Sequence, residues 1–218
     1  MPKKPQVIGV DESGKGDFFG PLVIAAFLAA DDAIPGLVSL GVRDGKLLSD
    51  KRVLEISRTL RHDFIHSVVM VGPEKYNQLY EKMRNLNKLL AWGHAQAIEN
   101  ITSRTPAALA VSDKFGKAEL VEQALARKNN KIEIRQLVRG ESIVQVAAAS
   151  IIARAAFIEA IDRMSSQYGL ELPKGAAAKV DEAGRQLARM HGTAVLGKTA
   201  KIHFKNYQRI VNPRLALE

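Results

Sequence analysis

Cysteine is absent from this chain of 218 residues, which excludes a disulfide framework and any thiol chemistry. Only 6% of the residues are aromatic, but hydrophobic residues reach 46% and charged residues 25%. That composition supplies enough apolar material for a core and is not typical of a disordered chain. Internal repeats and low-complexity linkers are also lacking. We therefore predict a single domain over residues 1–218.

No targeting signal is expected from the sequence either. The first five residues, Met1 to Pro5, contain no apolar core of a signal peptide, and no stretch approaches membrane-spanning length. Acidic residues are the scarcer charged type, 23 against 32 lysines and arginines, which gives a formal net charge of +9. Because neutralising phosphates releases counterions, this charge favours a polyanionic partner. We expect a soluble, monomeric, cytoplasmic protein without a membrane partner.

The basic residues gather around predicted turns and in the C-terminal part of the chain. Those that stand out are Lys46, Lys51, Arg52, Lys114, Lys117, Arg127, Lys128, Lys131, Lys198, Lys201 and Lys205. About half of them are expected to be ordinary solvated surface residues.

The most informative segment lies near the N-terminus, where the apolar run Val7 to Val10 leads into Asp11-Glu12-Ser13-Gly14-Lys15-Gly16-Asp17. Adjacent strand residues face opposite sides, so Asp11 and Glu12 are expected at a strand end where the chain begins to turn. Clustered carboxylates suit a hard divalent cation. The glycines beside Lys15 let the backbone approach a negatively charged strand, and the lysine adds a charge suited to phosphate. The segment therefore predicts a site for a metal and a phosphate.

Two other interpretations of this segment exist. A mononucleotide-binding loop needs a longer glycine spacing and a serine or threonine after the lysine, whereas Gly16 follows Lys15 here. A polar strand end with a hairpin turn over residues 14–20 would explain the same residues without any ligand. The second interpretation stays open from these residues alone.

Strand and helix patterns alternate along the chain. The predicted strands are Val7 to Val10, Leu22 to Leu28, His66 to Val71, Ala107 to Val111 and Ile132 to Val138, with the first two as an antiparallel hairpin. The predicted helices are Asp50 to His62, Asn87 to Asn100 and a long helix after Gly140. Asp113 follows an apolar run, at a strand end where ligands bind in α/β sheets. Glu141 is placed at the start of the long helix, whose dipole favours anions, and taken alone it is an ordinary helix-start acid.

These segments resemble those of the type 2 ribonucleases H, which carry Asp-Glu-x-Gly-(Lys/Arg)-Gly near the N-terminus. Further segments follow in the expected order: Asn85 to Asn100, Ser112-Asp113-Lys114-Phe115, Gly140-Glu141-Ser142 before the alanine-rich helix, Leu172 to Gly175, and Lys201 to Phe204. Ser13, Lys15 and Asp17 are similar to the ribonuclease HIII branch. Glu141 is also similar to the ribonuclease HIII branch, because ribonuclease HII usually has aspartate at this place.

The resemblance implies an α/β ribonuclease-H-like fold, with a mixed central β-sheet flanked by helices and a C-terminal helical segment. It implies that Asp11, Glu12, Asp113 and Glu141 are the catalytic metal ligands, and that Ser13, Gly14, Lys15, Gly16 and Lys46 bind substrate. The expected activity is endonucleolytic hydrolysis of the RNA strand of RNA–DNA hybrids with two Mg²⁺ or Mn²⁺ ions. One ion would activate a water and the other would stabilise the departing 3′-oxygen, which gives 5′-phosphate and 3′-hydroxyl ends.

The chain departs from the family pattern in three places. Asp44-Gly45-Lys46 stands where type 2 enzymes generally have Asp-Ser-Lys, so one backbone contact lacks its hydroxyl. Glu171 to Gly175 lacks the junction-sensing tyrosine of ribonuclease HII, which favours runs of ribonucleotides as substrate over ribonuclease HII-like incision at single ribonucleotides. Only six residues precede Val7, where ribonuclease HIII usually has a domain resembling the TATA-box binding protein. The chain is thus expected to be a natural short form or the catalytic part of a longer protein.

An alternative of another class is a non-catalytic nucleic-acid-binding protein with the same fold. It is disfavoured because a pure binder gains nothing from four acids that face phosphates. Trp92 and His94 are expected to be packing and helix-surface residues, and Arg154 is a candidate phosphate contact.

Overall fold

The structure is a computed structural model that describes residues 6–43 and 48–212. The chain divides into two compact units. The first comprises the residues up to Ser13, Val23–Val69 and Asn85–Ala156, and the second comprises Gly14–Leu22, Met70–Arg84 and the residues from Phe157 onwards. That residues 1–218 form a single domain stays a prediction.

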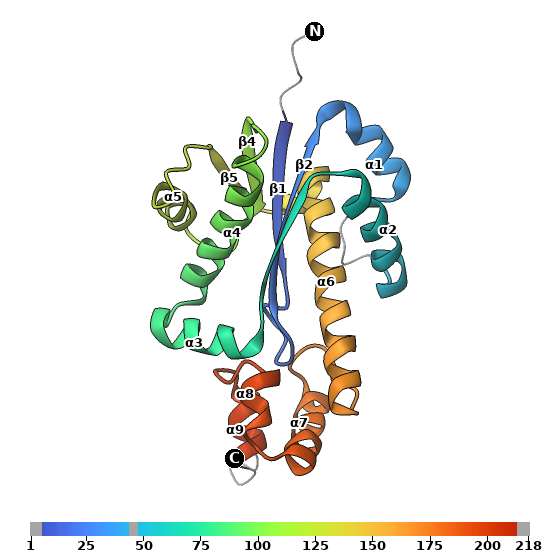
Figure 1. Ribbon diagram of the computed structural model, residues 1–218, viewed down its shortest axis with the longest axis vertical. Helices are drawn as coiled ribbons and strands as arrows, with labels where there is room; N and C mark the ends of the chain where they lie inside the picture. Colours follow the sequence, from blue (N-terminus) through green and yellow to red (C-terminus); the bar gives the residue numbers. More distant parts are fainter. Residues whose placement is uncertain (1–5, 44–47, 213–218) are drawn as a thin grey trace. The chain divides into compact units, whose positions relative to one another are not determined.

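The central element is a mixed five-stranded sheet with the strand order β3-β2-β1-β4-β5 (Figure 1). Its strands are β1 (Gln6–Ser13), β2 (Leu22–Ala30), β3 (His66–Val71), β4 (Leu109–Asp113) and β5 (Ile134–Leu137). β1 pairs antiparallel with β2 and parallel with β4, and β4 pairs parallel with β5. The predicted mixed sheet and the N-terminal antiparallel hairpin are therefore confirmed.

Helices separate the strands from β2 onwards and make up the C-terminal part of the described chain. They are η1 (Asp31–Ala33), α1 (Ile34–Leu40), α2 (Asp50–Asp63), α3 (Pro73–Met83), α4 (Leu86–Thr102), α5 (Ala118–Ala126), η3 (Gly140–Ser142), α6 (Val144–Tyr168), α7 (Ala178–His191), α8 (Val195–Thr199) and α9 (Lys205–Val211). The predicted helices correspond to α2, α4 and α6, and the last three helices form the predicted C-terminal helical segment.

Two glycines let helices pack closely on opposite faces of the sheet. A Cβ atom at Gly9 in β1 would lie 2.0 Å from the backbone carbon of Gln145 in α6. A Cβ atom at Gly93 in α4 would lie 2.6 Å from a side-chain methyl of Ile24 in β2. Ile24 pairs with Glu12, so it belongs to the face opposite Gly9. The N-terminal part of α6 and the middle of α4 therefore cover opposite faces of the sheet.

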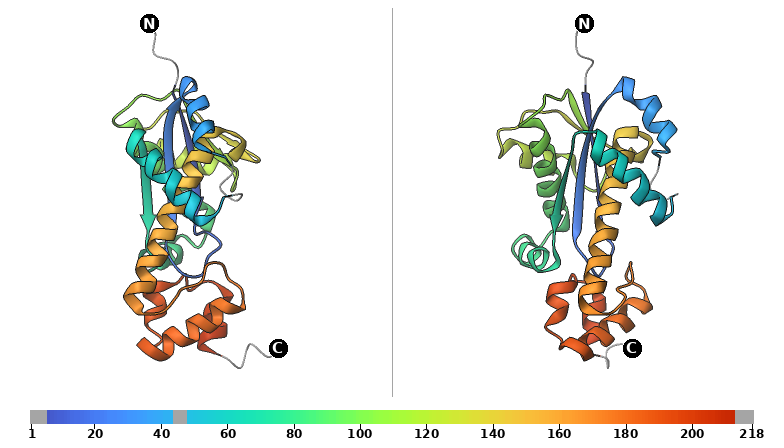
Figure 2. Two further views of the ribbon diagram at one scale, coloured as in Figure 1. Left: turned by 90° about the vertical axis from the view of Figure 1, so that its right-hand side faces the viewer. Right: turned by 45° about the vertical axis from the view of Figure 1, so that its right-hand side comes forward.

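The long helix α6 runs beside the sheet in Figure 2. It corrects one expectation, because by length and composition it is long and apolar enough to span a membrane. It has 25 residues, its most apolar window has a mean hydropathy of 1.6, and 78% of that window is buried. Burial of this extent is typical of the core helix of a globular protein, since a helix that is apolar all round needs cover.

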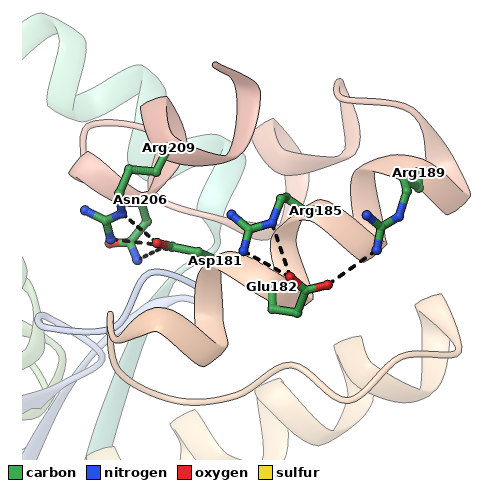
Figure 3. A network of polar contacts seen from close by, with 6 residues as sticks. All are labelled: Asp181, Glu182, Arg185, Arg189, Asn206 and Arg209. Atoms are coloured by element: carbon green, nitrogen blue, oxygen red, sulfur yellow. Dashed lines mark hydrogen bonds and ion pairs between the residues drawn. The ribbon is translucent and has the colours of Figure 1, made fainter. Parts of the chain in front are cut away.

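The C-terminal helices of the second unit are joined by a buried carboxylate. Asp181 in the first turn of α7 accepts hydrogen bonds from Asn206 Nδ2 at 2.6 Å and from Arg209 Nε at 2.6 Å, both in α9 (Figure 3). On the outer side of α7, Glu182 accepts from Arg185 and Arg189. Since a buried charge needs a partner, Asp181 has a structural role in tying α9 to α7.

Candidate metal centre and nucleic-acid interface

The parallel strands bring the candidate carboxylates to one edge of the sheet. β1, β4 and β5 run in the same direction, so their carboxyl ends share an edge. Asp11 and Glu12 lie near the end of β1, Asp113 is the last residue of β4, and Glu141 follows β5. Val10 pairs with Ser112, so Asp11 and Asp113 occupy corresponding positions on neighbouring strands and the same face. The fold therefore gathers all four acids within the first unit.

Asp11 and Glu12 differ from their expected placement. β1 continues through Ser13, so neither acid lies where the chain begins to turn. Their side chains consequently face opposite sides of the sheet, Asp11 toward α6 and Glu12 toward α4. The expectation that the strand would end at these acids was wrong, because Glu12 and Ser13 still pair with Ile24 and Val23 of β2.

Asp11 is a part-buried acid with a raised pKa. Burial raises its pKa from 3.8 to about 6, and the nearby charge of Glu12 acts in the same direction. Hydrogen bonds from the Ser150 hydroxyl on α6 and from the Glu12 amide, the latter at 2.8 Å, oppose this change. Hydrogen-bond donors thus hold the Asp11 carboxyl group in place, while burial and the charge of Glu12 disfavour its negative charge. A nearby cation would lower the pKa of Asp11 and favour the charged form.

Glu12 is bound from the opposite face by a histidine that was expected to be a packing residue. His94 in α4 is fully buried, and its Nε2 lies 3.1 Å from Glu12 Oε2. The imidazole also packs against the Phe115 ring, with centroids 4.5 Å apart. His94 is therefore neither a helix-surface residue nor only a packing residue. The sequence shows the helical periodicity of α4 but not how closely Gly93 lets this helix approach Ile24 in β2.

Asp113 is fixed by the segment that carries Glu141. The Gly140 amide donates a 2.9 Å hydrogen bond to Asp113 Oδ1. A Cβ atom at Gly140 would lie 2.9 Å from the backbone of Asp113, so the two segments touch directly. Glu141 belongs to the short helix η3, and α6 begins only at Val144. Its expected place at the start of the long helix was wrong by one short helical turn.

The donor set is chemically suited to a hard divalent cation. Across the described ranges 6–43 and 48–212, no group of three or more His, Cys, Asp or Glu side chains is preassembled with metal-binding geometry. The acids nevertheless converge on one sheet edge, and Asp11 carries a disfavoured charge beside Glu12. Carboxylate oxygens in this environment fit Mg²⁺ or Mn²⁺, which would neutralise the repulsion.

The glycine loop after β1 belongs to the second unit and is braced by two distant segments. The Gly175 amide donates to Asp17 Oδ1 at 2.6 Å, and the Phe18 amide donates to the Gly175 carbonyl at 2.9 Å. Gly14 has a φ of +84°, and a Cβ there would lie 2.2 Å from the carbonyl oxygen of Pro21, so this position requires glycine. At Gly16 a Cβ would meet nothing within 4 Å. Packing therefore explains the first glycine of the loop and leaves the second one open to a ligand.

Lys201 provides the other brace and was wrongly grouped with the basic surface. It is fully buried, and its Nζ donates to the carbonyl oxygens of Asp17 at 2.8 Å and Gly20 at 2.7 Å. Burial lowers its pKa from 10.5 to about 7, with the Asp17 carboxylate opposing that change. Apart from its place in the family segment Lys201 to Phe204, the sequence shows no pattern that distinguishes this lysine from surface lysines.

Other predicted substrate residues have different surroundings. Ser13 ends β1, and Lys15 is half-buried in the loop. Lys46 and Gly45 lie outside the described residues. Arg154, a candidate phosphate contact, forms a 2.7 Å ion pair with Asp50.

Comparisons with known proteins decide the family. The ribonuclease HII family model matches residues 8–207. The chain belongs to the ribonuclease HII family. Ribonuclease HIII of Chlamydia felis is 44% identical to this ribonuclease over 206 residues, which cover 93% of the chain and 69% of the relative. Ribonuclease HIII of Protochlamydia amoebophila is 39% identical over 204 residues, covering 94% and 68%.

A solved structure agrees with the sequence relatives. Bst-RNase HIII in complex with Mn²⁺ superposes on this ribonuclease with a TM-score of 0.89 at 33% identity, covering 95% of this chain and 70% of that one. The ribonuclease-H-like fold is confirmed. The family consists of hydrolases that act on RNA in RNA–DNA hybrids, and this member is a metal-dependent endoribonuclease.

Proposed function

We propose that this ribonuclease cuts the RNA strand of RNA–DNA hybrids by a two-metal mechanism, with Asp11, Glu12, Asp113 and Glu141 as the metal ligands. The observation that carries this proposal is the delivery of all four carboxylates to one sheet edge by three parallel strands. Two bound divalent cations would supply an activated water and stabilise charge on the departing 3′-oxygen. The products would carry 5′-phosphate and 3′-hydroxyl ends.

The chain's own residues orient the site and hold the substrate. Gly140 fixes one oxygen of Asp113, while Ser150 and His94 hold Asp11 and Glu12 from opposite faces. In the loop, open space at Gly16 would let the ribose–phosphate backbone come close to the main-chain amides. Lys15 would add a charge for phosphate, and Ser13 and Lys46 are the further proposed contacts.

Cleavage of a labelled RNA–DNA hybrid in Mg²⁺, Mn²⁺ and EDTA tests the activity. We expect cleavage with either ion and none in EDTA, with 3′-hydroxyl ends on the upstream fragments. Binding of the hybrid without cleavage in both metals would favour the non-catalytic nucleic-acid binder. The ratio of the Mg²⁺ and Mn²⁺ rates would also decide which cation this enzyme prefers.

The ribonuclease HIII-like substrate preference needs its own test. Glu171 to Gly175 contains no tyrosine, and its last residue braces the loop through Asp17. Without a junction contact, recognition must be gathered from several 2′-hydroxyls. A DNA duplex with four consecutive ribonucleotides should therefore be cut at least about tenfold faster than one with a single ribonucleotide. Equal or faster incision at the single ribonucleotide would favour the ribonuclease HII-like alternative.

We also propose that the protein acts as a cytoplasmic monomer without a membrane partner. The net charge of +9 suits a nucleic-acid substrate, and the apolar helix α6 is mostly buried. Light scattering after gel filtration would test the monomer, and fractionation of cells that express the protein would test its location.

A further inference from the structure

His94 is an unusual residue for the interior of this fold. Its side chain is 0% exposed, and its Nε2 lies 3.1 Å from Glu12 Oε2, whose side chain is only 11% exposed. Glu12 as a carboxylate accepts hydrogen bonds, so Nε2 must carry the donated proton. The bond joins the middle of α4 to a proposed metal ligand on β1, 82 residues earlier in the chain.

Packing alone does not require an imidazole at this position. Within the part of the chain that the structure describes, His94 Nδ1 is buried and has no hydrogen-bond partner. A buried polar atom without a partner is unfavourable, so an apolar side chain of similar size would fill the same space at less cost. The imidazole packs against the Phe115 ring, two residues beyond Asp113, at an interplanar angle of 51°, which limits how the imidazole can rotate. The hydrogen bond to Glu12 is thus what the imidazole supplies and an apolar side chain would not.

The neighbouring acid is held in the same way from the other face. Asp11 accepts from Ser150 on α6, while Glu12 accepts from His94 on α4. Each helix approaches the sheet at a glycine, Gly9 for α6 and Gly93 for α4. Asp11 and Glu12 are adjacent in the chain but face opposite sides of the sheet, so a different helix orients each side chain.

We propose that His94 is a positioning residue that fixes the Glu12 carboxylate in the orientation in which it binds a divalent cation. The inference rests on the proposed function, since it takes Glu12 as a metal ligand. Hydrogen bonds to ligating carboxylates orient the ligand, and their removal typically lowers metal affinity or activity about 10- to 100-fold. His94 would touch neither the metal nor the substrate.

Two amide variants form a matched pair for the test. In His94→Gln the amide nitrogen can take the place of Nε2 and still donate to Glu12. In His94→Asn the shorter amide can reach only the place of Nδ1, so the bond to Glu12 is lost while a polar amide remains. His94→Leu removes both nitrogens and fills the space with apolar atoms. Ile98→Ala, a fully buried position one turn further along α4, controls for general loss of packing.

The decisive readout is Mn²⁺ binding to the protein alone, measured by calorimetry. If His94 had a purely structural role, Mn²⁺ affinity would not depend on whether a hydrogen-bond donor occupies the place of Nε2. We expect His94→Asn and His94→Leu to weaken Mn²⁺ binding about 10- to 100-fold, and His94→Gln to stay within about threefold of wild type. Ile98→Ala should lower the unfolding temperature and leave Mn²⁺ affinity unchanged. Hybrid binding in EDTA should be the same for all of them.

A double variant separates this inference from the proposed function. Glu12→Gln should itself weaken Mn²⁺ binding, and adding His94→Leu to it should cause no further loss if His94 acts through Glu12. One outcome would overturn the role of His94 and leave Glu12 as a ligand. In that outcome folded His94→Leu or His94→Asn keeps wild-type Mn²⁺ affinity and kcat, while Glu12→Gln is impaired. An unimpaired Glu12→Gln would overturn the assignment of Glu12 and with it this inference, whereas hybrid cleavage by the wild type would still stand as the test of activity.

Discussion

Asp113 can be altered in charge with little change in shape. The substitution Asp113→Asn would keep an oxygen that can accept from the Gly140 amide, so the contact between β4 and η3 would survive. The loss of charge should remove metal binding and reduce kcat by roughly a thousandfold, since metal stabilisation of the transition state contributes several kcal/mol. Hybrid affinity in EDTA should stay within about threefold.

Single-turnover cleavage and fluorescence anisotropy would measure both quantities. Asp50→Asn is a suitable control, because it removes an acid that pairs with Arg154 outside the proposed ligand set. A variant at position 113 that retains more than a few per cent of the wild-type rate in saturating metal would contradict the ligand assignment.

Lys201 gives the stability of the protein a pH dependence above neutrality. Burial lowers its pKa to about 7, whereas the unfolded chain keeps the ordinary value of 10.5. Between these values the unfolded state binds one more proton, so stability rises with pH from about 7 to about 10. The penalty for the buried charge is fully present below pH 7. Between pH 7 and pH 9.5 the free energy of unfolding should rise by at most about 3 kcal/mol. The two carbonyl acceptors stabilise the ammonium form, which keeps the rise below that limit.

Denaturant unfolding of wild type and Lys201→Met at pH 7 and pH 9.5 would test this linkage. The variant has no amine to titrate, so the difference in free energy of unfolding should shift in favour of the wild type at the higher pH. A constant difference would mean that the carbonyls of Asp17 and Gly20 keep Lys201 charged throughout this range.

Helix α6 depends on Gly9 for its close contact with β1. A Cβ atom there would lie 2.0 to 2.3 Å from the backbone of Gln145 and Val146, and backbone atoms cannot rotate away. Gly9→Ala should therefore lower the free energy of unfolding by about 1 to 3 kcal/mol and move Ser150 away from Asp11. Gly36→Ala in α1 is the matched control, since a Cβ there meets nothing within 4 Å and alanine favours a helix by about 1 kcal/mol. Thermal unfolding of both variants would show opposite shifts; equal shifts would contradict the packing argument.

Elements with strong periodicity were predictable, and others were not. β3 matches its predicted residues. α2 ends one residue later than predicted, and α4 begins one residue earlier and ends two residues later. Helices α3 and α5 were missed, because short amphipathic stretches beside glycine and proline resemble loops in sequence. β1 was predicted too short, since polar residues at Asp11 to Ser13 mimic a strand end while their backbone still pairs with β2.

At the scale of the molecule, the sequence predicts the four acids of the proposed site but not the contacts that hold them. The resemblance implied a mixed sheet without its strand order, and the parallel pairing of β1 with β4 is what brings Asp11 and Asp113 to one edge. The roles of His94 and Lys201 depend on distances between segments 82 and about 180 residues apart, which no local pattern encodes. Long-range contacts of buried polar groups are therefore the part of this site that needed the structure.

The excess of basic residues predicts how the whole molecule responds to salt. With a net charge of +9, affinity for a hybrid should depend on phosphate neutralisation and fall about a thousandfold between roughly 50 and 200 mM KCl if about six phosphates are contacted. Lys15→Ala should reduce the slope of log affinity against log salt by about one charge, and Lys15→Arg should preserve it. Anisotropy titrations in EDTA at a series of KCl concentrations would measure the slopes. Binding that is insensitive to salt would mean that stacking or apolar contacts dominate, and an unchanged slope in Lys15→Ala would remove this lysine from the phosphate contacts.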